Sequence, residues 1–144
     1  MAPTKETPGG AWSRLLTPRR GVAAAFVLNG VLLGAWASRI PDVMARHGLG
    51  EAGLGILLLL MGIGALASFP VAGRLSDRRG AMRVTQGIAL VYLAALVLVG
   101  LAPSVALLGA ALLLFGAAHG AMDVTMNSWA AEVEKALSRS VMSS

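Results

Sequence analysis

Long stretches without a charged side chain constrain the fold of this chain most. The uncharged run from 52 to 73 is roughly 22 residues long, enough to cross a bilayer once as a helix. The run from 84 to 118 is roughly 35 residues long, about enough for two crossings, and a further run covers 21–38. We therefore predict an all-α membrane protein with four transmembrane helices, at about residues 21–45, 52–73, 84–101 and 104–131.

The composition agrees with a membrane protein. Hydrophobic residues make up 56% of the chain and charged residues only 13%, about half the charged share of a typical globular domain. The mean hydropathy is +0.73. The chain has 18 glycines and no cysteine, so disulfides and thiol nucleophiles are excluded, whereas close helix packing through glycine is favoured.

Lysine and arginine are concentrated at alternate ends of the predicted spans. Under the positive-inside rule, both termini lie in the cytoplasm of a multi-pass cell-membrane protein. Residues 1–20 are then a cytoplasmic tail, and 132–144 begin a cytoplasmic connection. The net charge of +5 is interpreted as a topology signal, so no nucleic-acid partner is predicted. The uncharged turn before the fourth span supplies Ser104 as a candidate helix N-cap.

The most distinctive polar segment connects the second and third spans and runs from 73 to 83. It places Asp77 among four arginines, at 74, 78, 79 and 83. One interpretation is that these arginines only hold the loop on the cytoplasmic side. The other is that Asp77 pairs with an arginine or with the positive end of a nearby helix.

The run Gly73-Arg74-Leu75-Ser76-Asp77-Arg78-Arg79-Gly80 resembles the loop between spans two and three of the major facilitator superfamily. Arg79 stands where that family usually has an aromatic residue, and Ala81 stands where it usually has an arginine. Arg83 would supply the displaced charge. In the family this loop latches the cytoplasmic side of the outward-facing state. The resemblance therefore implies a gating role for this set: Gly73, Asp77, Arg78, Gly80 and Arg83.

A second polar group lies within the fourth span. His119, Asp123 and Asn127 are four residues apart and share one face of a helix. A carboxylate inside a span is costly and normally faces the bundle interior or a wet cavity. Asp123 is either a structural contact to a neighbouring helix or a proton-titrating or substrate-binding acid with His119 as its partner. Gly116 and Gly120 form a small-residue pair that favours close helix packing.

The run from Trp36 to Pro41, together with the span-four residues from Gly116 to Asn127, is similar to the fucose-permease-like branch of the superfamily. In fucose permease an acid at the position matched by Asp123 is linked to proton-coupled sugar uptake. That permease also has an acid in span one near the position of Arg39. This chain has a base there, which argues against a simple copy of the sugar–proton mechanism.

Arg39 has two interpretations. Its side chain can extend to the outer interface with no further role. Alternatively it faces a cavity and binds an anionic or hydroxylated substrate, with Asn29 and Trp36 on the neighbouring face. With straight helices, Arg39 lies about 10 Å outside the midplane and Asp123 about 8 Å inside it. The two residues are therefore predicted to belong to separate sites.

The resemblance implies the first third of a twelve-helix fold, and hence a fragment of a secondary active transporter for a sugar-like or other small organic molecule. Its expected partners are the lipid bilayer, the small-molecule substrate, protons and the C-terminal part of the transporter. The four spans alone are not expected to transport. The alternatives are a small four-span multidrug-exporter-like dimer and a non-transporting membrane fragment or interaction protein. The sequence has no phosphate loop, metal-ligand cluster or nucleophile triad, so no enzymatic role, metal or cofactor is predicted.

Overall fold

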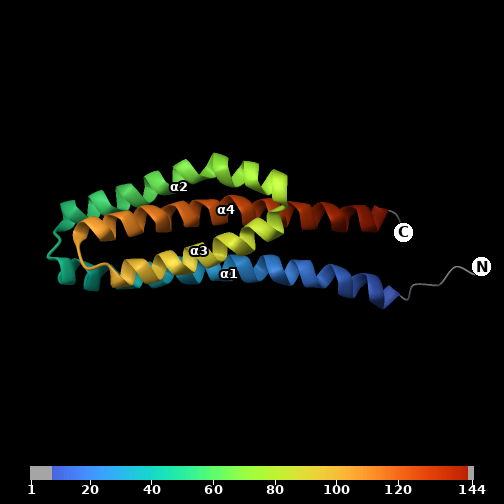
Figure 1. Ribbon diagram of the computed structural model, residues 1–144. Coiled ribbons are helices and arrows are strands. Elements are labelled where there is room, and N and C mark those ends of the chain that lie inside the picture. Colours follow the sequence, from blue (N-terminus) through green and yellow to red (C-terminus); the bar gives the residue numbers. More distant parts are fainter. Residues whose placement is uncertain (1–7, 143–144) are drawn as a thin grey trace, which may run out of the picture.

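The structure is a bundle of four long helices (Figure 1). The computed structural model describes the backbone of residues 8–142, and side chains within that range from Thr17 onward except at position 140. The helices are α1 (Pro8–His47), α2 (Glu51–Arg79), α3 (Ala81–Leu101) and α4 (Val105–Met142). No strand occurs within residues 8–142. The prediction of an all-α fold is confirmed.

All four helices are long and apolar enough to cross a membrane. Large apolar side chains such as Leu59, Leu66 and Leu90 lie more than 60% exposed on the outside of the bundle. In water such a surface would be unfavourable, whereas in a bilayer it contacts lipid while the helix satisfies its own backbone hydrogen bonds. The prediction of four transmembrane helices is confirmed.

The helices extend beyond the predicted spans. Helix α1 begins at Pro8 rather than near residue 21, and α4 continues to Met142 rather than ending near 131. The predicted spans end where charges appear, but a helix that leaves the membrane keeps its backbone hydrogen bonds. In Figure 1 the α2–α3 turn and both ends of the described chain lie toward one side of the bundle, opposite the α1–α2 and α3–α4 connections.

Helix α4 is the centre of the bundle and packs against each of the other three helices. Its side chains Leu108, Leu112, Phe115 and Met122 are almost fully buried. These positions are four, three and seven residues apart, so they form one apolar stripe along the helix. Ser104 directly precedes this helix, and its side-chain oxygen accepts a hydrogen bond from the backbone N–H of Leu107 at 3.3 Å. The predicted N-cap is confirmed.

Helices α2 and α4 approach so closely that their backbones are in contact. A Cβ atom added at Gly120 would lie 2.6 Å from the carbonyl oxygen of Ala65. Cβ atoms at Gly116 and Gly64 would overlap the backbone of the opposite helix, at Met61 and Leu113 respectively. The predicted packing role of Gly116 and Gly120 is confirmed, and the partner helix is α2.

Candidate functional site

A hydrogen-bonded network joins α1, α3 and α4 inside the bundle. The Nδ2 group of Asn29 donates to Oδ1 of Asp123 at 2.8 Å. Nδ1 of His119 lies 3.1 Å from Oδ1 of Asn29 and 2.9 Å from the hydroxyl of Tyr92. His119 Nε2 lies 3.7 Å from Oδ2 of Asp123, one helical turn along α4. We call these four residues, Asn29, Tyr92, His119 and Asp123, the polar network.

The polar network is enclosed on one side and open on the other. Tyr92 is fully buried and Asn29 is 9% exposed. The Tyr92 ring packs on Phe115 with a 4.8 Å centroid distance, which fixes the position of its hydroxyl group. The Asp123 side chain, in contrast, is 42% exposed. The carboxylate of Asp123 therefore accepts a hydrogen bond from Asn29 of α1 on one side. On its other side it is accessible from outside the bundle.

The polar network lies well inside the membrane-crossing part of the bundle. Tyr92 lies near the middle of α3, which has 21 residues and is thus about one bilayer long. Polar side chains at such depth are expensive unless they are paired, and they mark substrate or ion pathways. The arrangement offers a carboxylate, an imidazole, an amide and a hydroxyl group as hydrogen-bonding partners for a polar ligand.

Asn127 is not part of the polar network. Its Nδ2 group donates to the backbone carbonyl of Asp123 at 2.7 Å, within α4, and the side chain is exposed. The shared helical face was predicted correctly for His119 and Asp123. One turn further along, this asparagine bonds to its own helix.

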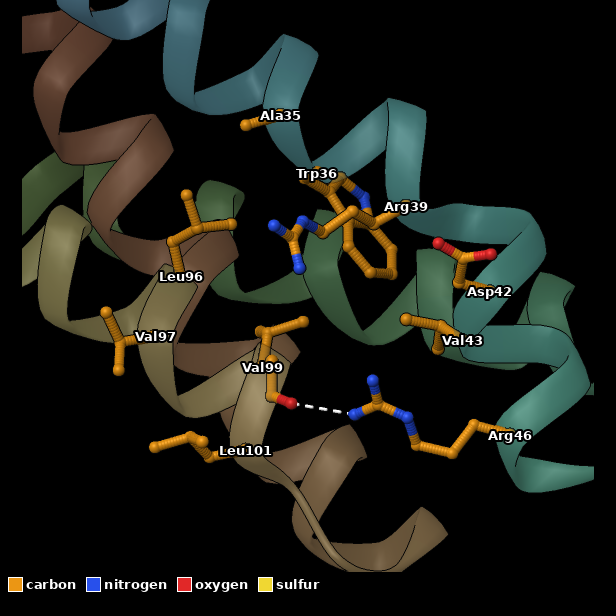
Figure 2. Close-up of a pocket in the computed structure, with 11 residues that line it drawn as sticks. Ala35, Trp36, Arg39, Asp42, Val43, Arg46, Leu96, Val97, Val99 and Leu101 are labelled. Atoms are coloured by element: carbon orange, nitrogen blue, oxygen red, sulfur yellow. Dashed lines mark hydrogen bonds between the residues drawn. The ribbon is translucent and has the colours of Figure 1, made fainter.

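Arg39 and Trp36 lie in a different place, a pocket of about 370 Å³ between α1 and α3 (Figure 2). The guanidinium of Arg39 points from α1 into this space, where Asp42 and Arg46 also lie. Arg46 donates to the backbone carbonyl of Gly100 at 2.8 Å, so it ties α1 to the end of α3. Trp36 is only 2% exposed and packs against Phe115.

The structure keeps Arg39 apart from Asp123, as predicted, but it corrects the grouping of Asn29. We expected Asn29 beside Arg39 and Trp36, whereas it bonds to Asp123 and His119. Ten residues of helix separate Asn29 from Arg39, which is about 15 Å along the axis. The side chains of Asn29 and Arg39 therefore lie at different heights along the bundle axis.

The segment between the second and third spans is not a loop. Helix α2 continues to Arg79, and Gly80 is the only residue between it and α3. The backbone N–H of Gly80 donates to the carbonyl of Ser76, and this hydrogen bond closes the last turn of α2. Our expectation of a loop over 73–83 is therefore wrong, because a helix that leaves the membrane can carry this many charges. Asp77, Arg78 and Arg83 are exposed.

Gly80 and Gly73 should respond differently to alanine. Gly80 has φ +88° and ψ 136°, a conformation that is strained for any residue with a Cβ atom. Gly73 is within α2 with no atom near its added Cβ. We expect Gly80→Ala to lower the free energy of unfolding by about 1–3 kcal/mol, and Gly73→Ala to leave it equal or slightly raised. Thermal unfolding of both variants in detergent tests this, and equal losses would contradict it.

Tyr92 is the functional candidate that sequence reasoning overlooked. A signal for it existed, because it is the only tyrosine of the chain and stands mid-way in an apolar span. A hydroxyl at such depth needs a hydrogen-bond partner. The sequence could not show that the partner is His119, because that contact depends on how α3 rotates against α4.

Four membrane-crossing helices around a mid-depth polar network define a multi-pass membrane protein of the transporter type. The model of the family described as Major Facilitator Superfamily matches residues 2–143. The chain belongs to this superfamily. The predicted membership is thereby confirmed, and it argues against the small four-span exporter. It also agrees with the prediction that the chain is not an enzyme.

Three curated relatives extend the comparison. The uncharacterized transporter y4wD of Sinorhizobium fredii is 60% identical over 131 residues, covering 91% of this chain and 35% of that protein. The membrane protein MosC of Rhizobium meliloti is 43% identical, covering 79% of this chain and 28% of that protein. An uncharacterized MFS-type transporter of Yersinia pestis is 42% identical, covering 83% of this chain and 31% of that protein. The chain thus spans about a third of the length of these relatives. No solved structure matches it.

Proposed function

We propose that this chain is the first part of a secondary active transporter that moves a small organic solute, sugar-like or similar, by alternating access coupled to protons. The observation that carries the proposal is the bond between Asn29 and Asp123. It brings an acid of α4 into contact with α1 inside a bundle of membrane-crossing helices. Superfamily membership supports transport as the general activity.

The Asn29–Asp123 bond offers a way to couple a proton to helix movement. An ionised Asp123 accepts a charge-assisted hydrogen bond from Asn29, which is stronger than a bond between neutral groups. Protonation removes the charge and weakens this link between α1 and α4. Proton binding at Asp123 would then favour one arrangement of α1 against α4, and deprotonation the other. Transport is driven by the proton gradient when substrate binding shifts the same equilibrium.

The substrate cavity is completed by helices from the rest of the transporter. In major facilitator folds the site forms between repeats near the midplane, and the Asp123 side chain is 42% exposed, which leaves it open to contact with further helices. Arg39 supplies a second polar position on α1 for an anionic or hydroxylated group of the substrate, beside the buried ring of Trp36. The four helices alone would not transport.

We further propose that the protein lies in the cell membrane with the α2–α3 turn in the cytoplasm. The last six residues of α2 and the first three of α3 carry four arginines, Arg74, Arg78, Arg79 and Arg83. Such charges favour the cytoplasmic side. Both ends of the described chain lie toward the same side. Reporter fusions after Met142 and within residues 48–50 would test this orientation, with cytoplasmic activity expected only for the first.

The intact transporter in sealed vesicles tests the function directly. Radiolabelled sugars, polyols and small organic acids are offered with an inward proton gradient, and the uptake is compared before and after a protonophore. We expect at least one of these compounds to accumulate, and its accumulation to collapse when the protonophore is added. Accumulation that the protonophore leaves unchanged would overturn proton coupling. No uptake of any compound, with the protein folded and correctly oriented, would overturn the substrate class.

The exposed residues of the α2–α3 segment are proposed as the gate. Gly80 sets the turn, and Asp77 with Arg78 and Arg83 presents charges that can pair with the other half of the transporter. We expect Asp77→Asn to lower the maximal uptake rate by roughly tenfold, equivalent to about 1.4 kcal/mol, with the half-saturating concentration nearly unchanged. Glu51→Gln, at the other end of α2, is the control. A changed half-saturating concentration with an unchanged rate would place Asp77 in substrate binding instead.

A further inference from the structure

The hydroxyl group of Tyr92 lies where it can determine which nitrogen of His119 carries a proton. His119 Nδ1 is within hydrogen-bonding distance of two oxygens, the Tyr92 hydroxyl at 2.9 Å and Asn29 Oδ1 at 3.1 Å. These oxygens differ in chemistry. The Tyr92 hydroxyl can donate or accept, whereas an amide oxygen only accepts. The amide nitrogen of Asn29 is already engaged with Asp123.

The two oxygens therefore favour different states of the His119 ring. When Nδ1 carries a proton, it donates to Asn29 Oδ1. When Nδ1 carries a lone pair, that lone pair faces an oxygen lone pair of Asn29, which is unfavourable, and only Tyr92 can donate to it. In the second state the ring proton is on Nε2, the nitrogen nearest Asp123.

Few titratable or charged groups surround His119. The titratable groups that face it are Tyr92 from α3 and Asp123 from its own helix, while α1 presents the amide of Asn29. Helix α2 packs against α4 near Gly120, where it presents Ser68. The Ser68 hydroxyl donates to the backbone carbonyl of Ala65, within its own helix. The charged residues of α2 lie at Glu51 and from Arg74 onward, near its two ends.

We propose that Tyr92 is a positioning residue that holds neutral His119 with its proton on Nε2, directed at Asp123. The imidazole N–H then stabilises the ionised carboxylate that Asn29 also contacts. When the ring gains a second proton, Nδ1–H donates to Asn29 Oδ1 and the Tyr92 hydroxyl turns to accept. Both charge states of His119 are thus satisfied at a part-buried position, because one neighbour can reverse its role. This rests on the proposed function only in assigning the His119–Asp123 pair to proton coupling.

Nitrogen NMR of the ring tests the proposal without a transport substrate. The intact protein is labelled with ¹⁵N-histidine and placed in lipid vesicles, and the His119 signals are identified by their loss in His119→Gln. Protons are the only probe, supplied by a pH titration. Protonated and unprotonated ring nitrogens have distinct shifts, so the spectra report the ratio of the Nε2–H to the Nδ1–H form of the neutral ring.

We expect Nε2–H to dominate in the native protein and the ratio to move about tenfold toward Nδ1–H in Tyr92→Phe, the effect of one buried hydrogen bond. Phenylalanine keeps the ring that packs on Phe115. Thr85→Val is the matched control, because it removes a buried hydroxyl of α3 that bonds only within its own helix, to Ala81. An unchanged ratio in Tyr92→Phe, or an equal shift in Thr85→Val, would overturn the proposal.

The outcome is separable from that of the proposed function. If Tyr92→Phe shifts the ratio while Asp123→Asn leaves uptake coupled to protons, the positioning role of Tyr92 stands and coupling at Asp123 fails. If Asp123→Asn uncouples uptake while the ratio in Tyr92→Phe is unchanged, coupling stands and the positioning role fails.

Discussion

Replacing Asp123 with asparagine is expected to abolish the dependence of uptake on the proton gradient. Asparagine has the size of aspartate, and its side-chain oxygen can still accept the hydrogen bond from Asn29 that Asp123 accepts at 2.8 Å. It cannot bind or release a proton. The variant should therefore fold and exchange substrate across the membrane, while accumulation against a gradient falls by a factor of ten or more, about 1.4 kcal/mol of lost coupling.

The measurement compares concentrative uptake with substrate exchange in vesicles that contain the intact transporter. Glu132→Gln is the matched control, because Glu132 is an exposed acid of the same helix, outside the polar network. It should retain accumulation. If Asp123→Asn vesicles still accumulate substrate and still lose it on addition of a protonophore, Asp123 has only a structural role, and the coupling acid lies elsewhere in the transporter.

The second large effect is expected at Gly64, in the contact between α2 and α4. A methyl group there would overlap the backbone of Leu113, which cannot move without displacing the whole of α4. Overpacking by one methyl group costs about 1–3 kcal/mol when side chains can adjust. Since a backbone must yield here, we expect Gly64→Ala to lie at or above the top of that range.

Gly62→Ala is the control for this substitution. It lies two residues away on the same helix, and an added Cβ atom meets nothing within 4 Å. The control should unfold at the native temperature or slightly above it, because alanine is the better helix former. Thermal unfolding in detergent and the yield of monodisperse protein distinguish the two variants. Similar behaviour of both would mean that the helices are further apart than the structure places them.

The helices could be predicted from the sequence because hydrophobic length alone determines membrane spans. The Ser104 cap and the packing of Gly116 and Gly120 follow from local chemistry in the same way. The pairing of His119 with Asp123 was also accessible, since both lie on one helix. The contacts of Asn29 and Tyr92 were not, because they depend on the rotation of α1 and α3 about their axes, and a single sequence shows no signal for that rotation.

The extent of α2 was underestimated for a different reason. Residues from Arg74 to Arg79 are polar and charged, a pattern that predicts a loop when a span must be apolar. Outside the hydrocarbon layer the same residues are good or neutral helix formers. Charge therefore indicated where the membrane ends but not where the helix ends.

The one-residue connection at Gly80 has a mechanical consequence. Because one residue connects the two helices, α2 cannot rotate about its axis or shift along it without moving the beginning of α3. Helix α3 bears Tyr92, about three turns from Gly80. A displacement of the charged end of α2 is thus passed to α3 through a single residue, with no longer loop in between to absorb it.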